Sequence, residues 1–214
     1  MLISVNNEKE KFSSYSHLFA LFLALAGSIS LIILAEDLSL LIVIIIYSIC
    51  LCYMFLASTL YHASKKTEND DTFWRKFDHI SIYFMIAGSY TAISYIYLDG
   101  ILRWIIISLQ WLFAIAGMIF KIFKLDIPNW IDVGIYLIMG WMIVVRMDYI
   151  FSQSPLRIFL LVLFGGIAYT IGAILHVIDK PLPFPKKFEF HEIFHVLIIV
   201  GASLHYVTVL LAVL

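Results

Sequence analysis

The sequence predicts an all-α membrane protein whose chain crosses the bilayer as a bundle of seven helices. Two features of its composition carry this prediction: 63% of the 214 residues are hydrophobic, and only 14% are charged. A single soluble core of this length cannot bury so much apolar surface. Apolar runs of about twenty residues, the length that crosses the hydrocarbon core, recur seven times along the chain.

Each apolar run is bounded by polar or turn-forming residues. A polar stretch precedes the first run, which is too long to be the apolar region of a cleavable signal peptide. The seven spans are expected at 17–35, 39–62, 79–98, 102–122, 128–147, 156–178 and 191–213. The connections between them are expected at 36–38, 63–78, 99–100, 124–128, 148–155 and 179–190. Since none of these connections can hold a second domain, we expect a short cytoplasmic segment, 1–16, followed by one transmembrane domain, 17–214.

Lysine and arginine residues set the expected orientation of the bundle. Of the 14 basic residues, the three arginines at positions 103, 146 and 157 fall on one side of the membrane, and the other eleven fall on the side of the N-terminus. Basic residues concentrate in cytoplasmic loops. We therefore expect a multi-pass protein of the cell (inner) membrane, with its N-terminus in the cytoplasm and its C-terminus outside.

Charge excludes or disfavours two classes of function. The net charge of -1 provides no basic field that would attract nucleic acid, so no nucleic-acid partner is expected. Few ionisable residues lie near the centres of the spans, and this disfavours a water-filled pore as the mechanism of any membrane damage.

Four possible metal ligands gather at the cytoplasmic ends of three spans. His62 ends the second span, Asp78 precedes the third, and His191 and His195 open the seventh. His191 and His195 are four residues apart and project from one helical face, while Ser58 lies one turn deeper than His62. A lone histidine at an interface is usually an anchor, so the prediction depends on their joint placement. Three such ligands can hold Zn²⁺ and leave the fourth position to water, as catalytic zinc sites do.

The segment from His191 to His195 also matches H-E-x-x-H, the zinc-protease helix in which the glutamate is the general base. Such enzymes need a further ligand, and the only histidine that follows is His205, ten residues and about 15 Å along the same helix. This disfavours a protease. Glu192 remains a secondary candidate for a general base.

The remaining polar residues of the spans carry weaker hypotheses. His17 and His176 can support the ligands through hydrogen bonds, but an interfacial polar role is the favoured interpretation for both. Asp132 is an intramembrane acid whose partner the pattern does not identify. His79 and His205 are not assigned to the metal.

Several of these motifs together resemble the hemolysin III family, the bacterial branch of the progestin and adipoQ receptor (PAQR) superfamily. The segment from Ser58 to His62 resembles the family's S-x-x-x-H at the end of helix two, and Phe77-Asp78-His79 resembles the start of helix three. The H-E-x-x-H segment resembles helix seven. Glu10 and Ser16-His17 resemble the N-terminal E-x-x-N-x-x-[ST]-H, although Ser13 stands where asparagine is usual.

The resemblance implies a zinc ion held by His62, His191 and His195, with Asp78 near the metal and Ser58 supporting the site. It also implies a similarity to alkaline ceramidases, which points to a zinc-dependent hydrolase acting on a lipid amide or ester. Asp78 would orient or deprotonate the water, and a membrane lipid would be the substrate or ligand. The alternative is a receptor-like or membrane-state regulatory protein in which zinc is structural, and cytolysis, which the family name suggests, ranks last.

Overall fold

The protein is a bundle of long helices, seen here in a computed structural model that describes residues 8–65, 73–123, 128–178 and 189–214. These residues contain no strand, and seven of their helical segments are long and apolar enough to cross a membrane. The elements are α1 (Glu8–Leu34), α2 (Leu38–Ser64), α3 (Phe73–Tyr97), α4 (Gly100–Phe123), α5 (Asn129–Gly140), η1 (Met142–Arg146), α6 (Met147–Gln153), α7 (Leu156–Ile178) and α8 (Phe190–Val213). The prediction of a seven-helix, multi-pass membrane protein is confirmed.

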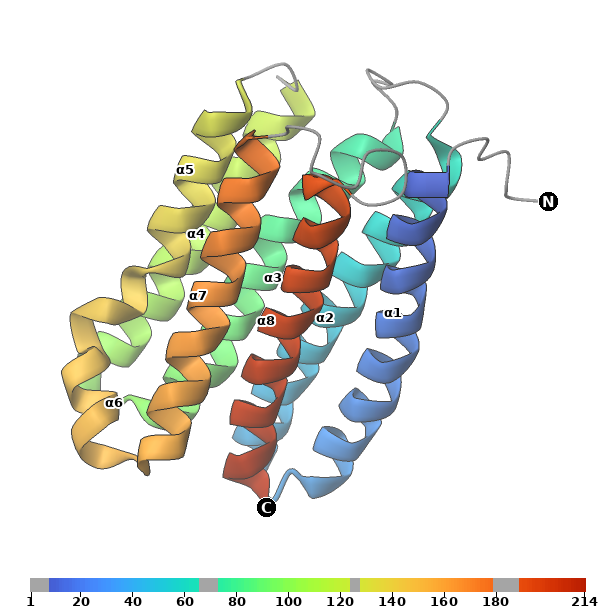
Figure 1. Ribbon diagram of the computed structural model, residues 1–214. Helices are drawn as coiled ribbons and strands as arrows, with labels where there is room; N and C mark the ends of the chain where they lie inside the picture. The colour runs from blue at the N-terminus through green and yellow to red at the C-terminus, as the bar shows by residue number, and fades with distance from the viewer. Residues whose placement is uncertain (1–7, 66–72, 124–127, 179–188) are drawn as a thin grey trace.

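The long helices run side by side, and α1 begins at one end of the bundle while α8 ends at the other (Figure 1). The middle of the bundle is formed by α3, which packs against α2, α4, α5 and α8. Large apolar side chains on the outer helices are exposed, as Phe19 and Ile33 on α1 illustrate. A surface of this kind requires lipid as its solvent.

The first helix starts earlier than the sequence predicts. It begins at Glu8 rather than at residue 17, and the polar side chains of Ser13, Ser14 and His17 are buried against neighbouring helices. Hydropathy placed these residues outside the span because it scores a polar side chain by its type and takes no account of its contacts. Residues 66–72, 124–127 and 179–188 of the expected loops lie outside the described residues. The loop expected at 63–78 is shorter than predicted, because α3 begins at Phe73 rather than at residue 79.

The fifth span differs from the single helix expected over 128–147. It breaks after α5 into the short η1 and α6, and α6 occupies most of the loop expected at 148–155. The Tyr90 hydroxyl donates to the Gly140 carbonyl at 2.6 Å and accepts from the Ile143 amide at 2.8 Å. Because the interior of a membrane supplies no water for broken backbone hydrogen bonds, these contacts make the interruption tolerable.

Close contact between α2 and α3 depends on Gly88. A Cβ atom at this position would lie 2.5 Å from Cβ of Cys50, which cannot move without its helix. By contrast, a Cβ atom at Gly166 would meet no described atom within 4 Å.

We therefore expect Gly88→Ala to lower the free energy of unfolding by about 1–3 kcal/mol, because the two helices must separate. Gly166→Ala is the matched control, and it should leave stability unchanged or raise it by up to about 1 kcal/mol. Thermal unfolding of both variants in the same detergent measures the difference. Equal stability of the two variants would contradict the packing described here.

Candidate metal centre

Three histidine side chains meet at the end of the bundle where α1 begins. His62 lies in the last turn of α2, and His191 and His195 lie in the first turns of α8. One ligand nitrogen from each lies within 4.8 Å of the other two, and the Nε2 atoms of His191 and His195 are 3.0 Å apart. Tetrahedral zinc with nitrogens at 2.0–2.1 Å separates its ligand atoms by about 3.3 Å, so this donor set fits a metal ion.

The start of α8 is fixed by a capping box. The Glu189 side chain accepts a hydrogen bond from the Glu192 amide, and the Glu192 carboxylate accepts one from the Glu189 amide at 2.5 Å. Such reciprocal capping satisfies amides that a helix start leaves unpaired. Glu192 is only 1% exposed, and its carboxylate caps the start of α8.

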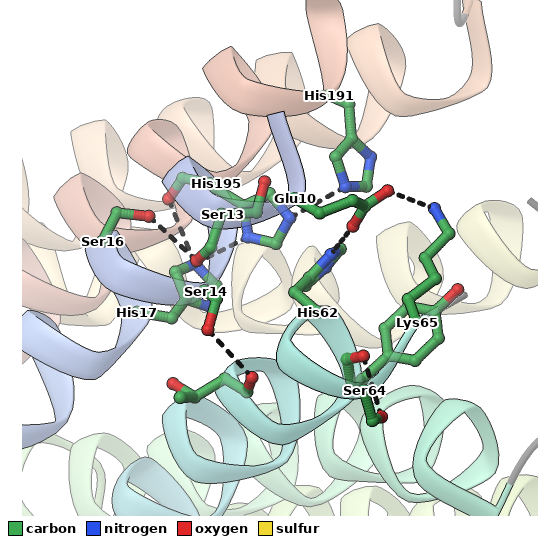
Figure 2. A network of polar contacts seen from close by, with 12 residues as sticks. Glu10, Ser13, Ser14, Ser16, His17, His62, Ser64, Lys65, His191 and His195 are labelled. Carbon is green, nitrogen blue, oxygen red and sulfur yellow. Dashed lines mark hydrogen bonds and ion pairs between the residues drawn. The ribbon is translucent and has the colours of Figure 1, made fainter. Parts of the chain in front are cut away.

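Two residues of α1 contact these histidines directly (Figure 2). Glu10 accepts a hydrogen bond from Nδ1 of His62 at 2.6 Å, and its other oxygen accepts one from the Lys65 ammonium group at 2.6 Å. Nε2 of His17 lies 2.9 Å from Nδ1 of His195. The buried His62 ring therefore contacts a carboxylate that Lys65 also binds, and the buried His195 ring contacts a second imidazole.

Sequence reasoning named Glu10 only as part of the N-terminal motif, gave it no contact with the metal centre, and favoured an interfacial role for His17. The signal that would have found both is their spacing. Polar residues at 10, 13, 14 and 17 follow the i, i+3, i+4, i+7 pattern of one helical face, here a polar face turned inward.

Asp78 and Ser58 lie beside His62, outside the group of mutually close nitrogens. The half-buried Asp78 side chain, at the start of α3, interacts electrostatically with His62 and with the Ser58 hydroxyl. Ser58 is 2% exposed, and its hydroxyl makes no hydrogen bond of normal geometry to another described residue. Three of the four predicted ligands, the histidines, thus lie close enough together to bind one metal ion, and the fourth, Asp78, interacts electrostatically with His62.

The remaining polar residues that the sequence singled out lie outside the group of three histidines. The His176 ring, on α7, lies 5.9 Å from the His191 ring. Asp132, whose partner the sequence did not identify, forms a buried ion pair with Lys121 that joins α5 to α4. His205 packs beside Gly165, away from the three histidines.

The chain is similar to known proteins over most of its length. The model of a family described as Haemolysin-III related matches residues 5–206. The chain is 35% identical to Hemolysin-3 of Bacillus cereus over 79% of its own length and 74% of the relative's. It is 29% identical to the human monocyte to macrophage differentiation factor, over 90% and 79% of the two chains. No solved structure shows a significant match.

Proposed function

The chain belongs to the Haemolysin-III related family, and from this premise we propose that it is a zinc-dependent hydrolase of a membrane-lipid amide or ester. One observation carries the proposal: three histidine nitrogens lie within 4.8 Å of one another, and one of these histidines, His62, interacts electrostatically with a half-buried carboxyl group, Asp78. This combination would provide a metal site and a base, which are the two elements that metal-dependent hydrolysis at a carbonyl group uses.

His62, His191 and His195 are the residues that would hold the zinc ion. Three protein nitrogens leave one of four positions free, which distinguishes catalytic from structural zinc sites. When bound in such a site, zinc polarises a carbonyl group and makes water acidic enough to attack at neutral pH.

Asp78 would serve as the base. Its carboxylate accepts a proton from the water, whose oxygen bonds to the carbonyl carbon. The C–N or C–O bond then breaks, and the proton passes to the departing amine or alcohol. Ser58 would orient this carboxylate, because its buried hydroxyl makes no regular hydrogen bond elsewhere among the described residues and interacts with Asp78.

The position of the site favours a lipid substrate. The three histidines come from the last turn of α2 and the first turns of α8, at the end of the bundle where α1 begins (Figure 1) and which we predict to face the cytoplasm. The ends of membrane spans lie near the depth where acyl chains join their headgroups. His191 and Asp78 are more exposed than the other site residues, since both are half-buried whereas His62 and His195 are 1% and 2% exposed, and a substrate would reach these two side chains first.

The test is an acyl-release assay on the full-length protein in lipid nanodiscs, with N-acyl and O-acyl lipids offered in turn. We expect release from at least one class, loss of release after chelation, and recovery with Zn²⁺ but not with Mg²⁺. Zinc-loaded protein that cleaves no lipid of either class would overturn the proposal. It would instead favour the structural alternative, in which zinc joins α2 to α8 in a receptor-like or regulatory protein.

A further inference from the structure

We infer that Glu10 and His17, on the first turns of α1, are positioning residues that orient His62 and His195 for metal binding and thereby set how tightly the metal is held. The inference rests on the metal centre of the proposed function and extends it to a helix that supplies no ligand. It is carried by two hydrogen-bond contacts, one to each buried ligand (Figure 2).

Glu10 determines which nitrogen of His62 is available to a metal. A carboxylate can only accept, so Nδ1 of His62 must carry the proton it donates across 2.6 Å, and Nε2 keeps its lone pair. The second oxygen of Glu10 is held by Lys65 at 2.6 Å. With both oxygens engaged, the carboxylate is fixed, and it fixes the imidazole plane in turn.

His17 has the corresponding effect on His195. The Nε2 atoms of His191 and His195 face each other at 3.0 Å, and both need free lone pairs to bind one metal ion. The proton of His195 must then sit on Nδ1, where Nε2 of His17 is placed to accept it at 2.9 Å. The same Nε2 lies 3.4 Å from the His195 carbonyl oxygen, and we assign the shorter contact. His17 then carries its own proton on Nδ1, which has no hydrogen-bond partner among the described residues. His17 is 2% exposed, so no water competes for this contact from bulk solvent.

Both contacts come from one face of one helix. Glu10 and His17 are seven residues apart, about two helical turns, and they reach ligands on different helices, α2 and α8. The beginning of α1 therefore contacts ligands from both helices of the metal centre and restricts the orientation of each. Because the two contacts orient different ligands, the effects of removing them should multiply.

The experiment measures the zinc dissociation constant of full-length purified protein by competition with a chromophoric chelator. Glu10→Ala and His17→Ala should each weaken binding by about 10- to 100-fold, and the double variant by about the product of the two. Glu10→Gln and His17→Gln keep a hydrogen-bond acceptor and should lose less. The visible spectrum of the Co²⁺-loaded protein should also change in both alanine variants, because it reports ligand geometry and not stability.

Ser14→Ala is the matched control. Ser14 lies between the two residues on the same buried face, but it donates to the Thr59 carbonyl at 3.2 Å and contacts no ligand. Its zinc affinity should stay within about twofold of the wild type, since orienting contacts act only through the ligands. Equal losses in Ser14→Ala would mean that helix docking alone matters, and unchanged affinity in all variants would mean that α1 does not position the ligands. Either result overturns the inference, while failure of the wild type to bind zinc overturns the proposed metal centre itself.

Discussion

Replacing His195 by alanine is expected to remove the bound metal and all lipid hydrolysis with it. His195 is the most connected of the three ligands, because its two ring nitrogens lie 2.9 Å from His17 and 3.0 Å from His191. Structural zinc sites with four protein ligands bind with about 10–16 kcal/mol in total, so the loss of one of only three protein ligands here should weaken binding by about 100-fold or more. Metal analysis after gel filtration, with acyl release measured on the same sample, tests this expectation.

His205→Ala is the control for this variant. It removes a histidine from the same helix, ten residues further on, where the ring packs against Gly165 rather than against a ligand. We expect it to retain its zinc and its turnover. Retention of stoichiometric zinc by His195→Ala would show that the metal is held by other residues.

Replacing Asp78 by asparagine should separate metal binding from turnover. The change keeps the size of the side chain and removes the base, so turnover should fall by about 10²- to 10⁴-fold. Bound zinc should remain, because the three histidine nitrogens form a close group without Asp78. Parallel measurements of kcat and of zinc content check both expectations.

Asp148→Asn is the matched change at an exposed carboxylate on α6, at the other end of the bundle (Figure 1). It should have no effect on either measurement. If Asp78→Asn hydrolyses lipid as fast as the wild type, then Asp78 is not the base. A structural role for the metal would follow if chelation also left hydrolysis unaffected.

The number and order of the spans could be predicted because lipid imposes a simple rule, a long apolar run for each crossing. The break in the fifth span could not. The residues around Gly140 and Trp141 are as apolar as their neighbours, and the backbone groups released there are satisfied by Tyr90, fifty residues away in sequence. Hydropathy carries no information about such a distant hydrogen bond.

The convergence of His62, His191 and His195 could be predicted because span ends fix depth and a four-residue spacing fixes a helical face. The contact of Glu10 with His62 was missed, since a charged residue ahead of an apolar run looks like one exposed to solvent. The role of Glu192, as a helix cap or as a general base, could not be predicted from the sequence. A capping box and a zinc-protease motif both place a glutamate in the first helical turn.

The partner of Asp132 was hidden for a related reason. Lys121 was counted among the basic residues at the cytoplasmic membrane face, whereas its side chain is fully buried and paired with Asp132. Sequence patterns within one helix do not reveal an ion pair that joins two helices.

The central claim is that three imidazoles of this chain bind one metal ion, and X-ray absorption at the zinc edge of the purified protein tests it most directly. The account predicts one zinc per chain, with about three imidazole nitrogens and one oxygen at 2.0–2.1 Å. Sulfur scattering near 2.3 Å, or protein that takes up no zinc after dialysis against it, would contradict the account.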